Sequence, residues 1–231
     1  MDQLDERVNL ALGFLRMAYN DYIAARVLLN RNYTMQGVML ASTSIERYFK
    51  TVICIYTGEK LRGHLDKFED FKRAVEEMGY GLLIEKMDPL FIDLLAKAYK
   101  LRYYDTIKEP TSIGFFKNQF LGELDGLVEL FERLVIITRG DREPILSPYK
   151  KAYKENNPDL MENNWIAMKI DKKKFMETDC IGFAIYVHPN NVFEEINVSS
   201  EKMALPYDGS MTLINVKGDA KDDTGNNEKE S

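Results

Sequence analysis

The apolar residues of roughly the first 140 positions recur every three or four residues, which is the period of a helix with one buried face. The longest such stretch covers residues 3–30, and its apolar stripe comprises Leu4, Val8, Ala11, Leu15, Ala18, Tyr22, Ala25 and Leu29. A second stretch covers residues 33–56, and its stripe comprises Val38, Ala41, Ile45, Phe49, Val52 and Tyr56. These two patterns predict two long helices.

Three further stretches with the same period predict helices at residues 66–78, 88–104 and 115–138. The second of these has strong start signals, because Asp88 is a good N-cap residue and Pro89 is favoured at the first helical position. Gly58 and Gly140 follow two of the five helices and are suitable stops. With a loop expected around residues 110–112, the pattern predicts a mainly α protein with four to five helices in residues 1–140.

The composition and the periodicity of the sequence change beyond residue 140. Residues 141–164 are rich in Pro and Asn, which is typical of a loop-rich connection. Four short β-like segments follow between turn residues, at positions 165–170, 180–187, 192–198 and 211–216. We therefore expect residues 165–217 to form a small β-containing appendage, either as a separate sheet or packed on the helices. The polar and acidic residues 218–231 are expected to be a disordered tail.

Charge and hydropathy narrow the class of protein. The 231 residues carry a formal net charge of −6, and almost all of the acidic excess lies beyond residue 140. General nucleic-acid-binding proteins usually have a basic excess, so general DNA binding is not expected, although a local basic pocket stays open. No apolar run approaches the roughly 18 residues of a membrane span. The acidic start of the chain does not resemble a signal peptide, so no membrane association and a cytoplasmic location are expected.

Residue types that bind metals or act as nucleophiles are sparse. The chain has two cysteines and two histidines, and no CxxC, HExxH or phosphate-loop spacing joins them to other groups. Cys54 lies in an apolar helical stretch and is expected to be a small buried hydrophobe. We therefore predict no metal site, no cofactor and no catalytic constellation.

Several short motifs in the helical part of the chain occur in a recognisable order and spacing. They are Asp21-Tyr22, Ser44–Lys50 (SIERYFK), Gly63–Asp66 (GHLD) and Ala98–Asp105 (AYKLRYYD). Together they resemble the HEPN domain family over residues 10–138, and nothing after residue 145 resembles it. The resemblance implies an up-and-down helical bundle that pairs as a homodimer.

The same resemblance implies a setting and candidate partners. Members of the HEPN family are associated with nucleotides or RNA, and many are RNases in toxin–antitoxin, phage-defence or RNA-processing systems. Others are catalytically silent or work beside a nucleotidyltransferase. A nucleotide or RNA is therefore the candidate ligand of this chain, and a nucleotidyltransferase is a candidate partner.

The sequence departs from the RNase members at the catalytic residue. Those members use an Arg followed four to six residues later by a His, which suits proton transfer near neutral pH beside a charged phosphate. Arg102 occupies the Arg position, but Thr106, Ile107 and Lys108 occupy the places of the His. We therefore expect a non-catalytic HEPN-like dimeric binding or interaction module. Two alternatives are a nucleotide- or RNA-end-binding protein that uses Arg102, and an accessory subunit of a nucleotidyltransferase or an RNase with a rearranged site.

The candidate ligand-binding residues begin with Arg102, Tyr104 and Asp105. In a functional site, Arg102 would hold a phosphate and Tyr104 would stack on a base. The competing interpretation is structural, because Arg102 and Asp105 are three residues apart and are spaced to pair with each other on a helix. The sequence slightly favours the structural interpretation.

Three more candidates are Arg47, Lys50 and His64, which could add positive potential or a titratable group to the same pocket. Lys50 is also spaced to form an ordinary helical ion pair with Glu46, and His64 is also suited to capping or packing in a loop. A separate basic run, Lys172–Lys174, lies near aromatic residues. Basic and aromatic residues together can bind single strands, but three lysines in a turn are more often a solvated loop.

Overall fold

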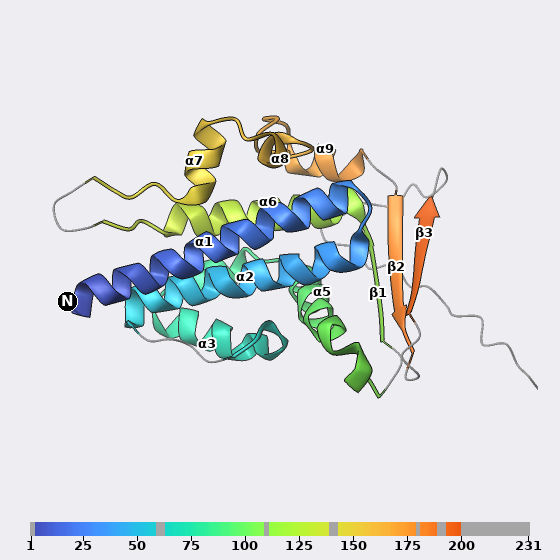
Figure 1. Cartoon of the computed structure of the whole chain (residues 1–231), viewed down its shortest axis with the longest axis horizontal. Coiled ribbons are helices and arrows are strands. Elements are labelled where there is room, and N and C mark those ends of the chain that lie inside the picture. The colour runs from blue at the N-terminus through green and yellow to red at the C-terminus, as the bar shows by residue number, and fades with distance from the viewer. Residues whose placement is uncertain are drawn as a thin grey trace, which may run out of the picture.

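The computed structural model describes residues 3–58, 63–108, 111–138, 143–178, 181–188 and 193–199. It is mainly α, with a small three-stranded antiparallel sheet at one end of the helical bundle (Figure 1). The predicted fold class is therefore confirmed. None of the described helices combines the length and the apolar composition that crossing a membrane requires.

The bundle is built on a hairpin of two long helices, α1 (Gln3–Asn30) and α2 (Thr34–Thr57), as the two longest apolar stripes predict. The turn between them places Asn32 in the left-handed region, with a φ of 62°. The predicted stop at Gly58 is confirmed, because this residue has a φ of 75° and its N–H donates to the carbonyl oxygen of Cys54. Cys54 itself is buried, as expected.

One side of α2 is covered by η1 (Leu65–Lys67), α3 (Phe68–Glu77) and α5 (Pro89–Lys100), and the short helix α4 (Gly81–Glu85) packs on α3. Asp88 caps α5 as predicted, because its carboxylate accepts the N–H groups of Leu90 and Phe91. The helix ends earlier than predicted. Residues 101–106 form the 3₁₀ segment η2 (Leu101–Thr106), in which Tyr103 has a non-helical backbone with φ −114° and ψ 41°.

The predicted loop is wrong at residues 111–112, and so is the predicted helix start at residue 115; residue 110 lies outside the described residues. Residues Thr111–Phe116 form strand β1, and helix α6 (Lys117–Leu134) begins directly after it. β1 pairs antiparallel with β2 (Ile181–Val187), which pairs in turn with β3 (Phe193–Ser199). The sheet therefore joins a segment of the helical region to two of the strands predicted for the appendage.

The predicted loop-rich connection contains helices. We call residues 147–178 the strap; it holds α7 (Pro148–Lys154), α8 (Pro158–Met161) and α9 (Lys172–Glu177), which lie along α6 and α1 on the side away from α3 (Figure 1). The predicted strand at residues 165–170 is wrong, because this segment is a series of turns in which Lys169 has a positive φ. The basic run Lys172–Lys174 is the start of α9 and not a turn. The predicted strand at residues 211–216 and the predicted disordered tail lie outside the described residues.

A buried ion pair fixes the strap to the bundle. Arg26 on α1 and Asp125 on α6 are both fully buried and form an ion pair. The Arg26 guanidinium also donates to the backbone carbonyl oxygen of Glu162 in the strap. The hydroxyl of Tyr22 donates to the same carboxylate oxygen of Asp125 at 2.8 Å. One charged cluster therefore ties together α1, α6 and the strap.

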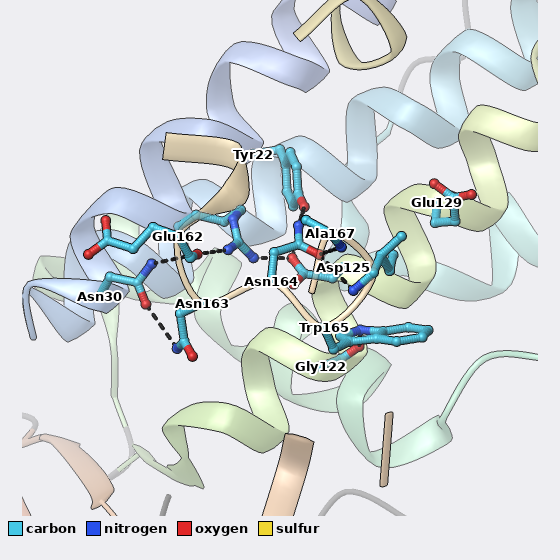
Figure 2. A network of polar contacts seen from close by, with 12 residues as sticks. Tyr22, Asn30, Gly122, Asp125, Glu129, Glu162, Asn163, Asn164, Trp165 and Ala167 are labelled. Atoms are coloured by element: carbon cyan, nitrogen blue, oxygen red, sulfur yellow. Dashed lines mark hydrogen bonds and ion pairs between the residues drawn. The ribbon is translucent and has the colours of Figure 1, made fainter. Parts of the chain in front are cut away.

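Further contacts extend this network along the strap (Figure 2). The Asn164 amide, also buried, donates to the Tyr22 hydroxyl at 3.4 Å. The indole N–H of Trp165 donates to the carbonyl oxygen of Gly122 on α6 at 3.2 Å. A Cβ on Gly122 would lie 2.7 Å from the Met176 side chain, so any larger residue would force that side chain of α9 to move. The strap is therefore packed as part of the core.

Candidate functional site

Tyr99, near the end of α5, is the centre of a surface where several of the predicted site residues meet. The imidazole of His64 stacks on its ring, with the centroids 4.8 Å apart and the planes 22° from parallel. The guanidinium carbon of Arg102 lies 4.9 Å from the centroid of the same ring, which is the geometry of a cation–π contact. Two residues that are far apart in the sequence therefore contact one aromatic ring.

Arg102 is held from a second direction by the backbone of α2. Its Nη2 donates to the carbonyl oxygen of Met39 at 3.1 Å, and the side chain is partly buried. Among the described residues Arg102 forms no ion pair with Asp105, which is exposed. The non-helical backbone of Tyr103, which lies between the two residues, explains this, because the pairing was expected on a regular helix. The Tyr104 side chain lies outside the described residues.

The carboxylate of Glu46 on α2 is the common partner of several polar groups near Tyr99. This buried carboxylate forms an ion pair with Lys50 at 2.6 Å and lies 3.3 Å from Nδ1 of His64. The backbone N–H of Leu65 donates to it at 3.3 Å. The Glu46–Lys50 helical pair is therefore confirmed, and His64 packs between a carboxylate and an aromatic ring.

Arg47 forms a contact between the two long helices. Its guanidinium pairs with the carboxylate of Asp21 on α1. Burial raises the pKa of Asp21, although the nearby charges of Arg47 and Arg102 act to lower it. The positive charges of Arg47 and Lys50 are thus both matched by carboxylates, so these residues add little net potential to the surface.

A cavity of about 440 Å³ opens beside Tyr99. Its lining combines aromatic rings with lysines and one carboxylate, from Asp66, Tyr99, Lys100, Tyr103, Ile107, Lys108 and Thr111. Burial and a hydrogen bond with Tyr103 raise the pKa of the Tyr99 phenol. Tyr103 is half exposed, so its ring is accessible from the solvent. Arg102 contacts the ring of Tyr99 but does not line the cavity.

Sequence reasoning missed the two lysines of this cavity. Lys108 is one of three residues at the place where the resemblance to HEPN RNases would put a His, and Lys100 lies inside the motif that carries that resemblance. Their spacing along the chain gives no sign of a shared cavity, because the 3₁₀ turn between them brings them together. The signal that was present is the cluster of Tyr and Lys residues between positions 99 and 108.

The cavity has the chemistry of a binding site for an anion that carries a ring. Ammonium groups pair with phosphates, and tyrosine rings stack on bases. Among the described residues, no three His, Cys, Asp or Glu side chains are grouped to hold a metal ion. Comparison with protein-family models, curated proteins and solved structures finds no match to this chain. The assignment of this surface therefore depends on its own geometry.

Proposed function

We propose that this chain is a non-catalytic, HEPN-like dimeric binding module of the cytoplasm, and that it holds a nucleotide or an RNA end in the cavity beside Tyr99. The observation that carries the proposal is the meeting of two lysines and two tyrosines around one cavity of about 440 Å³. The motif at residues 98–105, which carries the resemblance, supplies three of these four groups, Tyr99, Lys100 and Tyr103.

The lining suggests how such a ligand binds. Lys100 and Lys108 pair with a phosphate, and the half-exposed ring of Tyr103 stacks on a base. Stacking of a base on an aromatic side chain contributes about 1–3 kcal/mol. The carboxylate of Asp66, on the same rim, can accept a hydrogen bond from a ribose hydroxyl or a base amino group.

The same lining supports binding without cleavage. Cleavage of RNA needs a group that exchanges protons near neutral pH. None of the described residues that line the cavity is a histidine, and burial raises the pKa of Tyr99 further from neutrality. A phosphate held by these residues would therefore have no imidazole of the lining beside it, since His64 contacts the ring of Tyr99 but does not line the cavity.

A thermal-shift screen with nucleoside phosphates and short RNAs tests the proposal. A ligand at 100 times its Kd should stabilise the protein by about 2.7 kcal/mol. We expect this shift to disappear in Tyr103→Ala and in the double variant Lys100→Ala, Lys108→Ala. Lys154→Ala, on α7 at the far side of the bundle, is the matched control and should keep it. The proposal fails if no ligand shifts the wild type, or if the site variants respond as the control does.

One observation favours a second candidate, an RNase with a rearranged site. His64 and Arg102 both contact Tyr99, and Glu46 lies within hydrogen-bonding distance of the imidazole. In this arrangement Glu46 would orient His64 for proton transfer, and Arg102 would stabilise the charge on the phosphate. RNA cleavage by the wild type that is lost in His64→Ala would establish this candidate. Intact RNA after incubation with the wild type would eliminate it.

The dimer and the partner enter the proposal through the resemblance to the HEPN family. Light scattering on the purified chain measures its oligomeric state directly, and we expect the mass of two chains. A nucleotidyltransferase that binds the chain in a pull-down with purified components would support the role of an accessory subunit. A monomer in solution would remove the dimer from the proposal and leave the cavity unaffected.

A further inference from the structure

A second cavity, of about 250 Å³, lies where the strap meets the bundle. The strap contributes Trp165 and Lys172, and the bundle contributes apolar residues of α5 and α6. The full lining is Lys86, Met87, Asp88, Phe91, Glu123, Gly126, Leu127, Glu129, Leu130, Arg133, Trp165 and Lys172. The cavity shares no residue with the one beside Tyr99.

Gly126 lets the strap form one wall of this cavity. A Cβ at Gly126 would lie 3.6 Å both from Cζ2 of Trp165 and from Nζ of Lys172. The ring of Trp165 is held in place by its N–H, which donates to the Gly122 carbonyl oxygen (Figure 2). The indole and the ammonium group therefore both face the same point of α6, and Phe91 and Leu130 add to the apolar lining.

The carboxylates of the lining already have partners. Glu123 is buried and pairs with Lys172 at 2.8 Å. Glu129 accepts hydrogen bonds from Arg133 and Tyr149, both at 2.9 Å. Asp88 accepts two backbone N–H groups as the cap of α5. A cationic ligand would have to share each carboxylate with a partner that the protein already supplies.

The ammonium groups of the lining have N–H donors that the described contacts do not use. An ammonium group has three donors, and the described contact of Lys172 with Glu123 uses one of them. Lys86 is exposed, and its ammonium group has no ion-pair or hydrogen-bond partner among the residues that the structure describes. The lining therefore offers a ligand ammonium N–H donors that lie beside an apolar wall.

We propose that this cavity binds a small aromatic carboxylate, whose ring packs against Trp165 and Phe91 and whose carboxylate pairs with Lys86 and Lys172. The volume supports a ligand of one ring, because cavities for larger organic ligands typically have about 300–1,000 Å³. The strap supplies half of the contacts named here, so the ligand joins the strap to the bundle. This inference is independent of the function proposed for the cavity beside Tyr99.

Fluorescence of the full chain tests the inference, because Trp165 is the only tryptophan in the sequence. We expect phenylacetate to change the emission of Trp165 in a saturable way. Phenethylamine and 2-phenylethanol carry the same ring with opposite or no charge, and they should bind at least about tenfold more weakly, as the loss of a charge-assisted hydrogen bond predicts.

Two variants of different kinds locate the site. Lys86→Met removes an exposed charge without touching the core, and it should weaken binding of phenylacetate about tenfold. Gly126→Val fills the cavity and should abolish binding, with circular dichroism to check that it folds. Lys154→Met, on α7, is the matched control and should bind like the wild type.

The inference is overturned if phenylacetate leaves the emission unchanged, if phenethylamine binds as tightly, or if Lys86→Met retains full affinity. The thermal shift caused by a nucleotide should persist in Gly126→Val. Failure of the inference about this cavity can therefore be distinguished from failure of the function proposed for the cavity beside Tyr99.

Discussion

At the scale of single residues, the buried pair of Arg26 and Asp125 illustrates how polar groups position the strap. Both side chains are fully buried, and Nε of Arg26 and Oδ2 of Asp125 have no hydrogen-bond partner among the described residues. Burying two charges costs a desolvation energy that their attraction only partly offsets. The pair is therefore better explained by the geometry it imposes on the strap than by a net gain in stability.

Breaking this pair from one side should be costly. Arg26→Met leaves the Asp125 charge buried and unpaired, which we expect to lower the free energy of unfolding by about 3–5 kcal/mol. The double variant Arg26→Met, Asp125→Asn removes the unpaired charge and should recover more than half of the loss. Urea denaturation of the wild type and both variants measures this, and a single variant as stable as the wild type would contradict the account.

Glu132 on α6 should give the protein a distinctive pH dependence. Burial raises the pKa of its carboxyl above the ordinary value, although the hydroxyls of Ser147 and Tyr48 donate to it and act in the opposite direction. A carboxyl whose pKa is raised by folding stabilises the folded state most below the pKa of the unfolded chain. That contribution is lost as the pH rises through the raised pKa of the folded state.

Glu132→Gln removes this titration and keeps an oxygen that can accept a hydrogen bond. We expect the variant to lose less stability than the wild type when the pH is raised from about 4 to neutrality, an interval that begins near the ordinary pKa of Glu. Thermal unfolding at a series of pH values measures the difference. Glu76→Gln, at an exposed position of α3, is the control. Parallel curves for the wild type and Glu132→Gln would show that Glu132 does not titrate in this way.

The sequence allowed some of these contacts to be predicted and not others. The Glu46–Lys50 pair follows from helical spacing within α2, and it is present. The contact of His64 with Tyr99 depends on how η1 packs against α5, which no local pattern records. The contact of Arg102 with the same ring depends on the 3₁₀ turn that follows Lys100, where the sequence predicts a continuous helix. The predicted role of Arg102 as a phosphate ligand stays a prediction.

At the scale of elements, the long helices could be predicted because each has its own apolar stripe. Strand β1 could not, because its partner β2 lies far along the chain and its six residues carry no alternating pattern of burial. The helices of the strap did have local signals. Ser147 and Asn157 cap α7 and α8, and each is followed by a proline at the first helical position.

A truncated chain tests whether the strap belongs to the core. Ending the chain after residue 142 would remove the strap and β2, expose the Arg26–Asp125 pair and leave β1 without its partner. We expect a large fall in Tm, or no cooperative unfolding at all. A chain that ends after residue 199 keeps every described residue and is the control. An unchanged Tm after truncation at residue 142 would show that the first 142 residues fold independently of the strap.

At the scale of the whole molecule, the two cavities lie near opposite ends of α5. Asp88 and Phe91 at the start of the helix line one of them, and Tyr99 and Lys100 at its end line the other. The net charge of −6 provides no general attraction for nucleic acid. Binding at the cavity beside Tyr99 must therefore depend on local contacts, and it should weaken as salt screens the two lysines.

The most direct test of the central claim is a calorimetric titration of the full chain with a short single-stranded RNA that carries a 5′-phosphate, at low and high salt. The account predicts one saturable site that is weaker at high salt, absent in the Lys100→Ala, Lys108→Ala variant, and from which the RNA is recovered intact. Binding that is equally strong in the variant, no binding at either salt concentration, or recovery of cleaved RNA would contradict it.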